Sequence, residues 1–109
     1  MSLHRGQVVK NRYRADGLLG QGGYVSVYKA WDLTLERYCA LKESSDISSI
    51  AEQQFKREAV MLANLNHPNL ARVSDYFVVP NQGHYLVMDY IEGLDLGQLL
   101  EKSGNPLAE

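Results

Sequence analysis

The chain contains 109 residues, of which 45% are hydrophobic and 22% are charged, and its formal net charge at pH 7 is −2. These values are typical of one globular domain or part of one, and they exclude a strongly basic nucleic-acid-binding surface and a disordered charged chain. Because no apolar run is long enough to span a bilayer and the single cysteine, Cys39, lies in an apolar segment, we expect a cytoplasmic protein with a reduced thiol, no membrane segment and no secretory leader.

The first half of the chain has the pattern of three β-strands joined by turns. Residues 13–20 are predicted to form a short strand that ends at a glycine. Residues 24–31 combine β-branched and aromatic types, which favour strands, so the two segments and the glycines between them predict a hairpin. A turn over residues 32–36 then leads to a third strand over residues 37–43.

A long helix is predicted after the third strand. Ser49 followed by Glu52 fits a capping box, which marks the start of a helix. Apolar side chains then recur at helical spacing, at Phe55, Ala59, Leu62 and Leu65. The helix is expected to end near Asn64 or Asn66, because Pro68 disfavours helical backbone in the residue before it.

The remainder of the chain predicts two more strands and a short helix. The strands cover residues 72–79 and 84–91, and the segment 80–83 between them has turn composition. The short helix begins at Asp95. Together these elements predict an α+β fold, in which five strands in meander order form a mainly antiparallel sheet with the long helix packed on one face.

The glycine-rich turn is the first candidate for a binding site. Backbone amides in such a turn can point at a phosphate, and the absence of side chains lets a ligand approach closely. The alternative is a hairpin that needs glycine only for a positive φ angle. A dinucleotide fingerprint is excluded because residues 26–29 have strand character, and a P-loop is excluded because no Gly-Lys-Ser/Thr follows.

A lysine and a glutamate form the second candidate. Strand alternation places Ala40 and Lys42 on one face of the third strand, and Cys39 and Leu41 on the other. Glu58 borders the apolar stripe of the long helix, where a carboxylate is costly unless it is paired. Since the helix and the third strand are neighbours in sequence, Lys42 is the natural partner. The alternative is that both side chains reach water.

These features together resemble the N-terminal lobe of a protein kinase of the bacterial eukaryotic-like (Hanks) Ser/Thr type. The resemblance covers the chain from about Tyr13 to Leu100, and it includes the strand motif Cys39-Ala40-Leu41-Lys42. It implies that Lys42 holds the α- and β-phosphates of ATP and pairs with Glu58. It also implies that residues 20–27 cover the phosphates, with the glycines of this loop being Gly20, Gly22 and Gly23.

The resemblance further implies an adenine site on the same lobe. Leu19 and Val27 would lie over the adenine, and Ala40 would leave room for the flat base. Met88 would be the gatekeeper residue at the back of the pocket. Without the family context, a core methionine is the better interpretation of Met88.

The segment after Met88 would complete the nucleotide site. Backbone groups of Asp89 and Ile91 would bond the adenine, as the hinge does in this family. Asp95 matches the acidic position near the ribose. It also has the pattern of a helix N-cap, with Gln98 three residues later, and both roles are compatible.

One loop position departs from the family pattern. The third glycine of the loop is replaced by Val25, a stiff β-branched residue that cannot copy the conformations of glycine. Val25 is expected either to fix the loop in strand geometry or to crowd the phosphates, and Gly23 could compensate. We therefore expect a reduced affinity for ATP.

Two further family motifs do not occur in the 109 residues. The chain contains no His-Arg-Asp catalytic loop and no Asp-Phe-Gly metal site, since the segment Asp75-Tyr76-Phe77 belongs to a strand and lacks the glycine. We therefore expect residues 1–109 to be the ATP-binding half of a kinase domain, inactive alone, with the ligands for Mg²⁺ in the other lobe and no metal site in this one.

The expected partners follow from the same resemblance. The parent kinase would transfer the γ-phosphoryl group of MgATP to a protein hydroxyl, so its partners would be the nucleotide and a protein substrate. Self-association is expected through the apolar surface of residues 88–100, which would meet the other lobe in an intact kinase. The alternative function is a pseudokinase lobe or another non-catalytic module that binds a nucleotide or a protein.

Overall fold

The computed structural model describes residues 3–64 and 72–90. All five predicted strands and the long helix are present in this part of the chain. The elements are β1 (Val8–Val9), β2 (Tyr13–Gly22), β3 (Val25–Asp32), β4 (Arg37–Ser44), α1 (Ser49–Ala63), β5 (Val73–Val79) and β6 (Gly83–Asp89). The short helix predicted from Asp95 lies outside the described residues.

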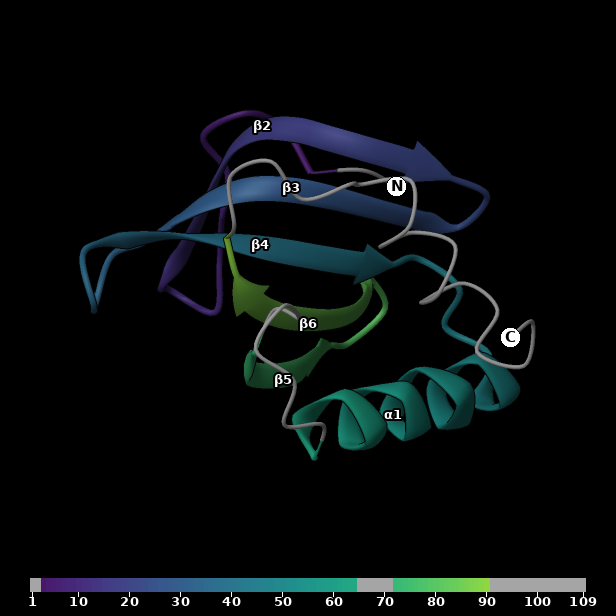
Figure 1. Ribbon diagram of the computed structural model, residues 1–109. Coiled ribbons are helices and arrows are strands. Elements are labelled where there is room, and N and C mark those ends of the chain that lie inside the picture. Colours follow the sequence, from purple (N-terminus) through teal and green to yellow (C-terminus); the bar gives the residue numbers. More distant parts are fainter. Residues whose placement is uncertain (1–2, 65–71, 91–109) are drawn as a thin grey trace.

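The strands form one antiparallel sheet with α1 on one side (Figure 1). This confirms the predicted α+β class, but the meander order is wrong. The strand order is β1-β2-β3-β4-β6-β5, so the chain leaves β4, passes through α1, enters the sheet at its edge as β5 and returns beside β4 as β6. β6 is buried along almost its whole length and β5 only partly, which explains why the later strand occupies the inner position.

The sheet has six strands where five were expected. The additional strand is β1, in which Val8 pairs with Arg14 and Val9 pairs with Tyr13. Two residues are too few to show an alternating pattern, so the strand could not be recognised in the sequence.

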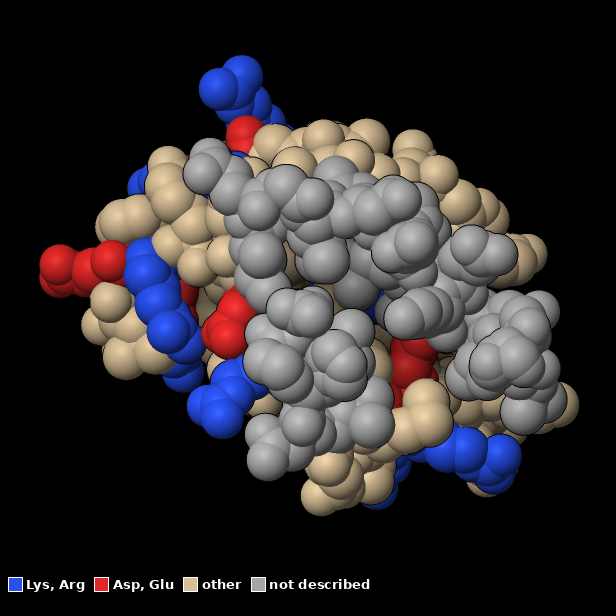
Figure 2. All heavy atoms as spheres, viewed as in Figure 1, with Lys and Arg blue, Asp and Glu red and all other residues tan. Residues whose placement is uncertain are grey.

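Basic and acidic side chains are paired over much of the sheet. Lysine or arginine contacts aspartate in four ion pairs of the described residues, which are Lys10–Asp75, Arg12–Asp32, Arg14–Asp16 and Arg37–Asp89. Figure 2 shows basic and acidic side chains next to one another on the left of the view. These four pairs therefore neutralise part of the positive charge on the sheet.

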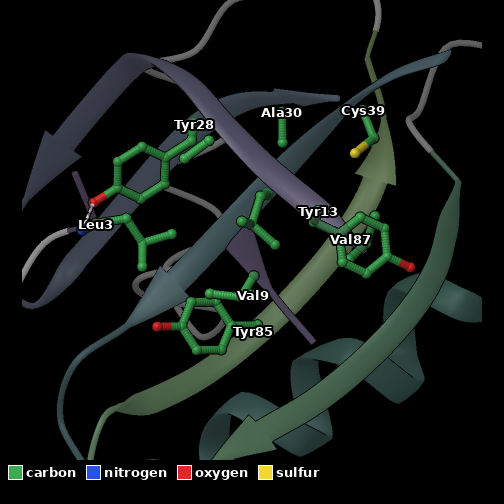
Figure 3. Packing of buried hydrophobic residues seen from close by; sticks show 10 residues of the cluster. Leu3, Val9, Tyr13, Tyr28, Ala30, Cys39, Tyr85 and Val87 are labelled. Atoms are coloured by element: carbon green, nitrogen blue, oxygen red, sulfur yellow. Dashed lines mark hydrogen bonds between the residues drawn. The ribbon is translucent and has the colours of Figure 1, made fainter. Parts of the chain in front are cut away.

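The two faces of the sheet bury separate hydrophobic clusters. The first cluster lies within the curl of the sheet (Figure 3) and consists of Leu3, Val9, Tyr13, Ala15, Tyr28, Ala30, Cys39, Leu41, Tyr85 and Val87. The second cluster lies between the sheet and α1 and consists of Val27, Ala40, Phe55, Ala59, Leu86 and Met88. The predicted alternation in β4 is confirmed, because Cys39 belongs to the first cluster and Ala40 to the second.

Polar contacts close the curl around the first cluster. Asp75 on β5 accepts hydrogen bonds from the Tyr13 hydroxyl on β2 and from Lys10 Nζ, both at 2.8 Å. The ring of Phe77 stacks on Tyr13 at 5.8 Å and on Tyr85 at 5.1 Å between centroids. The sheet therefore bends until β2 and β5, which are distant in strand order, come into contact.

A carboxylate is buried at the edge of the first cluster. Glu43 Oε1 accepts a hydrogen bond from the Tyr28 hydroxyl at 3.2 Å, and Oε2 accepts one from the Tyr85 hydroxyl at 2.6 Å. The Tyr28 hydroxyl in turn accepts a hydrogen bond from the backbone N–H of Leu3 at 2.9 Å. Burial and the bond to Glu43 raise the pKa of Tyr85 above its usual range. This network ties the N-terminal segment to β4.

The N-cap of the helix lies one residue before the predicted capping box. The N-cap is Ser48, whose side chain accepts a hydrogen bond from the N–H of Ala51 at 3.2 Å. Asp46 Oδ1 accepts the N–H of Ser48 at 3.0 Å and holds that residue in the extended conformation that an N-cap requires, so the capping box at Ser49 is wrong. The C-cap is Asn64, as predicted. No helix within the described ranges has both the length and the apolar character needed to cross a membrane.

Candidate functional site

The centre of the site is an ion pair between β4 and α1. Lys42 Nζ lies 2.7 Å from Glu58 Oε1, and the exposed fractions of the two side chains are 0% and 3%. In the sheet, Lys42 pairs with Val27 on β3 and with Leu86 on β6. Its strand, β4, is therefore an inner strand of the sheet. The predicted pairing is confirmed, and the alternative in which both side chains reach water is wrong.

Burial and pairing act on Lys42 in opposite directions. Burial lowers the pKa of Lys42 because a charged ammonium loses its hydration, and the adjacent Glu58 carboxylate raises the pKa by favouring the charged form. The site can therefore present a cation from which water is excluded, where its attraction for an anion is stronger than at the surface.

Phe55 also contacts the ammonium group, and sequence reasoning assigned it only to the core. Lys42 Nζ lies 5.3 Å from the centroid of the Phe55 ring. The spacing in the sequence could have indicated this contact, because Phe55 and Glu58 are three residues apart and share one face of α1. The same ring lies 5.9 Å from the rings of Tyr76 and His84.

The glycine-rich turn joins β2 to β3, and β3 pairs with the strand that carries Lys42. Gly22 pairs with Val25 at the end of β2, and Gly23 has a φ angle of 58°. The hairpin therefore does need glycine for a positive φ. A Cβ atom placed on Gly22 or Gly23 would meet nothing within 4 Å, so the backbone of the turn remains open to a ligand. The hairpin and the phosphate-binding interpretations are thus compatible.

Val25 occupies ordinary strand backbone at the start of β3. It pairs with Gly22 on one side and with Ser44 on the other. It is not among the residues with positive φ. Val25 was expected either to fix the loop in strand geometry or to crowd the phosphates. The structure shows strand geometry, which β-branched valine favours.

The apolar residues expected around an adenine lie together in or against the second cluster. Val27, Ala40 and Met88 belong to the second cluster, and Leu19 packs against it. Leu19 reaches the cluster because the β2–β3 register shifts between Leu18 and Gly20, which leaves Leu18 55% exposed. The structure therefore brings these four predicted residues to one face of the sheet.

The segment expected to contact the edge of the base is described only in part. The backbone N–H of Asp89 donates a hydrogen bond to the carbonyl oxygen of Arg72 at 2.9 Å. The Asp89 N–H is therefore already paired with another backbone group of the chain. Ile91 and Asp95 lie outside the described residues.

Within residues 3–64 and 72–90, no three His, Cys, Asp or Glu side chains lie close enough together to hold a metal ion. Lys42 and the open turn provide positive charge and backbone amides, and the second cluster provides an apolar surface. These are the groups that bind an organic phosphate.

Comparison with known proteins gives consistent matches. The family model described as protein kinase domain matches residues 13–109. Serine/threonine-protein kinase pkn3 of Myxococcus xanthus is 33% identical over 102 residues, which cover 89% of this chain and 18% of that protein. Serine/threonine-protein kinase PknA of Mycobacterium tuberculosis is 37% identical over 111 residues, which cover 95% of this chain and 26% of that protein.

A solved structure described as "PpkA-294 apo form" has the same fold. It aligns with a TM-score of 0.71 and 26% identity, over 99% of this chain and 45% of the other. The chain thus spans less than half the length of each of these proteins.

Proposed function

The chain belongs to the protein kinase domain family, and from this premise we propose that it forms the nucleotide-binding lobe of a serine/threonine protein kinase. The parent protein would transfer the γ-phosphoryl group of MgATP to hydroxyl groups of proteins. The observation that carries the proposal is the buried ion pair of Lys42 and Glu58, at 2.7 Å, on the face of the sheet next to the glycine-rich turn.

In this proposal the chain's own residues bind and orient the nucleotide. Lys42 would contact the α- and β-phosphates, and Glu58 would keep the ammonium charged and in place. The backbone amides of Gly20, Gly22 and Gly23 would contact phosphate oxygens. When bound, MgATP supplies the phosphoryl group, and its metal ion neutralises part of the phosphate charge.

The apolar side of the site would hold the base. Leu19, Val27, Ala40 and Met88 offer a largely apolar surface, and burial of a flat ring against it would exclude water. The carbonyl of Asp89 would bond the base. The roles of Ile91 and Asp95 stay predictions.

Three further proposals concern the chain as a whole. Residues 1–109 alone would be inactive, because the sequence contains neither the His-Arg-Asp nor the Asp-Phe-Gly motif. A cytoplasmic location is supported by the buried free thiol of Cys39, whose pKa is raised by burial to about 11. Self-association through residues 88–100 stays a prediction, and most of these residues lie outside the described ranges.

The test is a titration of the 109-residue chain with MgATP, followed by NMR. We expect chemical-shift changes at Val27, Ala40 and Met88 that are absent or strongly reduced in Lys42→Met. The matched control is Lys56→Met, which removes a lysine from the exposed side of α1 and should bind like the wild type.

The same titration bears on a second candidate function, which Val25 in the third glycine position favours. A folded chain without nucleotide-dependent shifts would reject the proposal and support a non-catalytic binding module. Nucleotide binding that does not depend on Lys42 would support a pseudokinase lobe.

A further inference from the structure

The aromatic ring of Phe55 lies against the charged end of Lys42. The distance from Lys42 Nζ to the ring centroid is 5.3 Å, which is within the range of about 6 Å over which a cation is attracted to an aromatic face. Lys42 is 0% exposed and Phe55 is 6% exposed. Because water is excluded from both groups, little solvent screens the attraction.

The ammonium group needs more than one partner. It carries three protons, and Glu58 Oε1 accepts one of them at 2.7 Å. A buried charge is costly unless its surroundings compensate for the lost hydration. Phe55 offers a second region of negative potential from the same helix, one turn before Glu58.

The ring itself is held by the sheet. Tyr76 on β5 and His84 on β6 each lie 5.9 Å from Phe55 between ring centroids, with interplanar angles of 34° and 35°. These contacts limit the positions that the ring can adopt. They also link the packing of α1 on β5 and β6 to the side chain of Lys42 on β4.

We propose that Phe55 is a positioning residue for Lys42, which it holds in its charged form by a cation–π interaction that acts together with the ion pair to Glu58. Phe55 would not touch the substrate. This proposal rests on the proposed function in one respect only, which is that Lys42 binds phosphate. The physical claim concerns two side chains whose contact can be measured without a nucleotide.

The test replaces Phe55 by 4-fluoro-, 3,5-difluoro- and 3,4,5-trifluorophenylalanine in the 109-residue chain. Fluorine withdraws electron density from the ring face while the shape of the side chain changes little. The measurement is the pKa of Lys42, from NMR of chain labelled with ¹³C-lysine, with the signal assigned by its loss in Lys42→Met. We expect the Lys42 pKa to fall stepwise with fluorination, by roughly 0.5 to 1.5 across the series.

Lys29 is the internal control in the same spectra. Its Nζ lies over the rings of Tyr38 and Tyr90, at 4.3 Å and 4.9 Å, so its aromatic partners are not the ring that is fluorinated. The NMR signal of Lys29 at a given pH should stay constant across the series. Glu58 lies beside Lys42, and Tyr76 and His84 lie against the Phe55 ring, so the signals of these three residues are followed as well and must not account for the change.

Two substitutions by natural amino acids complete the test. Phe55→Leu keeps apolar bulk but has no ring, and it should lower the Lys42 pKa, whereas Phe55→Tyr should restore it. A Lys42 pKa that is constant across the fluorinated series would overturn the proposal and leave Phe55 as a packing residue. If the Lys42 pKa depended on fluorination but MgATP caused no chemical-shift changes, only the proposed function would be rejected.

Discussion

Lys42 and Glu58 form an ion pair, 16 residues apart in the chain, in which neither side chain has more than 3% of its surface exposed. A buried pair of this kind is weak evidence for stability, because its desolvation can cost more than the attraction returns. Its presence between β4 and α1 is better explained by a function that needs a charged lysine at this position. Stability measurements can separate these two explanations.

The first prediction concerns the removal of one or both partners. Lys42→Met should lower the free energy of unfolding by about 3–5 kcal/mol, because it leaves the Glu58 carboxylate buried without its cation. The double variant Lys42→Met/Glu58→Leu should recover most of this loss, since both charges are replaced by apolar groups. Urea denaturation of both variants measures the difference, with Lys56→Met as the exposed control. A double variant as unstable as the single one would contradict the functional explanation.

Much of this site could be anticipated because it depends on local periodicity. Alternation along residues 39–42 is enough to place Lys42 on the face of Ala40, and helical spacing is enough to direct Glu58 toward the sheet. The free-energy cost of burying an unpaired carboxylate then predicts that Glu58 pairs with Lys42. Each step uses a repeat of a few residues, and the structure confirms the resulting pair.

The errors arise where the outcome depends on contacts between distant segments. β6 lies between β4 and β5 because both of its faces are buried. The sequence pattern of one strand does not show its position relative to the other strands. The contact of Phe55 with Lys42 needs the position of α1 on the sheet, which spacing alone does not provide. The helix N-cap lies at Ser48 because the side chain of Asp46 fixes the preceding loop.

The second prediction concerns the pH dependence of a buried aspartate. Asp32 accepts hydrogen bonds from Arg12 Nε and Nη2, both at 2.9 Å, and from the N–H groups of Thr34 and Leu35 at 2.9 Å and 3.1 Å. These bonds, that of Arg12 first, hold the pKa of Asp32 below its usual value. A depressed carboxyl pKa means that the stabilisation is complete above the pKa of the unfolded chain, about 3.9, and is lost as the pH falls through the folded pKa.

Asp32→Asn should therefore lower the free energy of unfolding by about 1.5–3 kcal/mol at neutral pH. The difference from the wild type should shrink below about pH 4 and vanish in stronger acid. Thermal unfolding of both proteins at a series of pH values from about 2 to about 7 measures this difference. Asp16→Asn, at the more exposed pair with Arg14, is the matched control and should have little effect. A difference that does not depend on pH would show that the charge of Asp32 is not responsible.

The third prediction concerns a histidine buried without hydrogen bonds. His84 is 3% exposed, and neither ring nitrogen has a hydrogen-bond partner in the described part of the structure. A buried polar group left unpaired costs about 1–3 kcal/mol. His84→Leu, which keeps a similar volume, should raise the free energy of unfolding by about 1–2 kcal/mol, whereas His4→Leu at an exposed position should not. Loss of stability in His84→Leu would reveal a partner of the imidazole.

The fourth prediction separates the two glycines of the β2–β3 turn. A Cβ atom on Gly22 or Gly23 meets nothing within 4 Å, but only Gly23 of the two has a positive φ, at 58°. Gly23→Ala should cost about 1–2 kcal/mol, because an L-residue is strained in the left-handed conformation. Gly22→Ala should be neutral or stabilising by up to about 1 kcal/mol, because it restricts the unfolded chain.

Denaturation of the two alanine variants under the same conditions measures the effect of backbone conformation alone, since neither new side chain meets a neighbour. Gly23→Asn should recover part of the loss, because asparagine tolerates the left-handed region better than alanine does. If Gly23→Ala proved as stable as Gly22→Ala, the turn would not require a positive φ at Gly23, and the need for glycine there would have to come from the approach of a ligand.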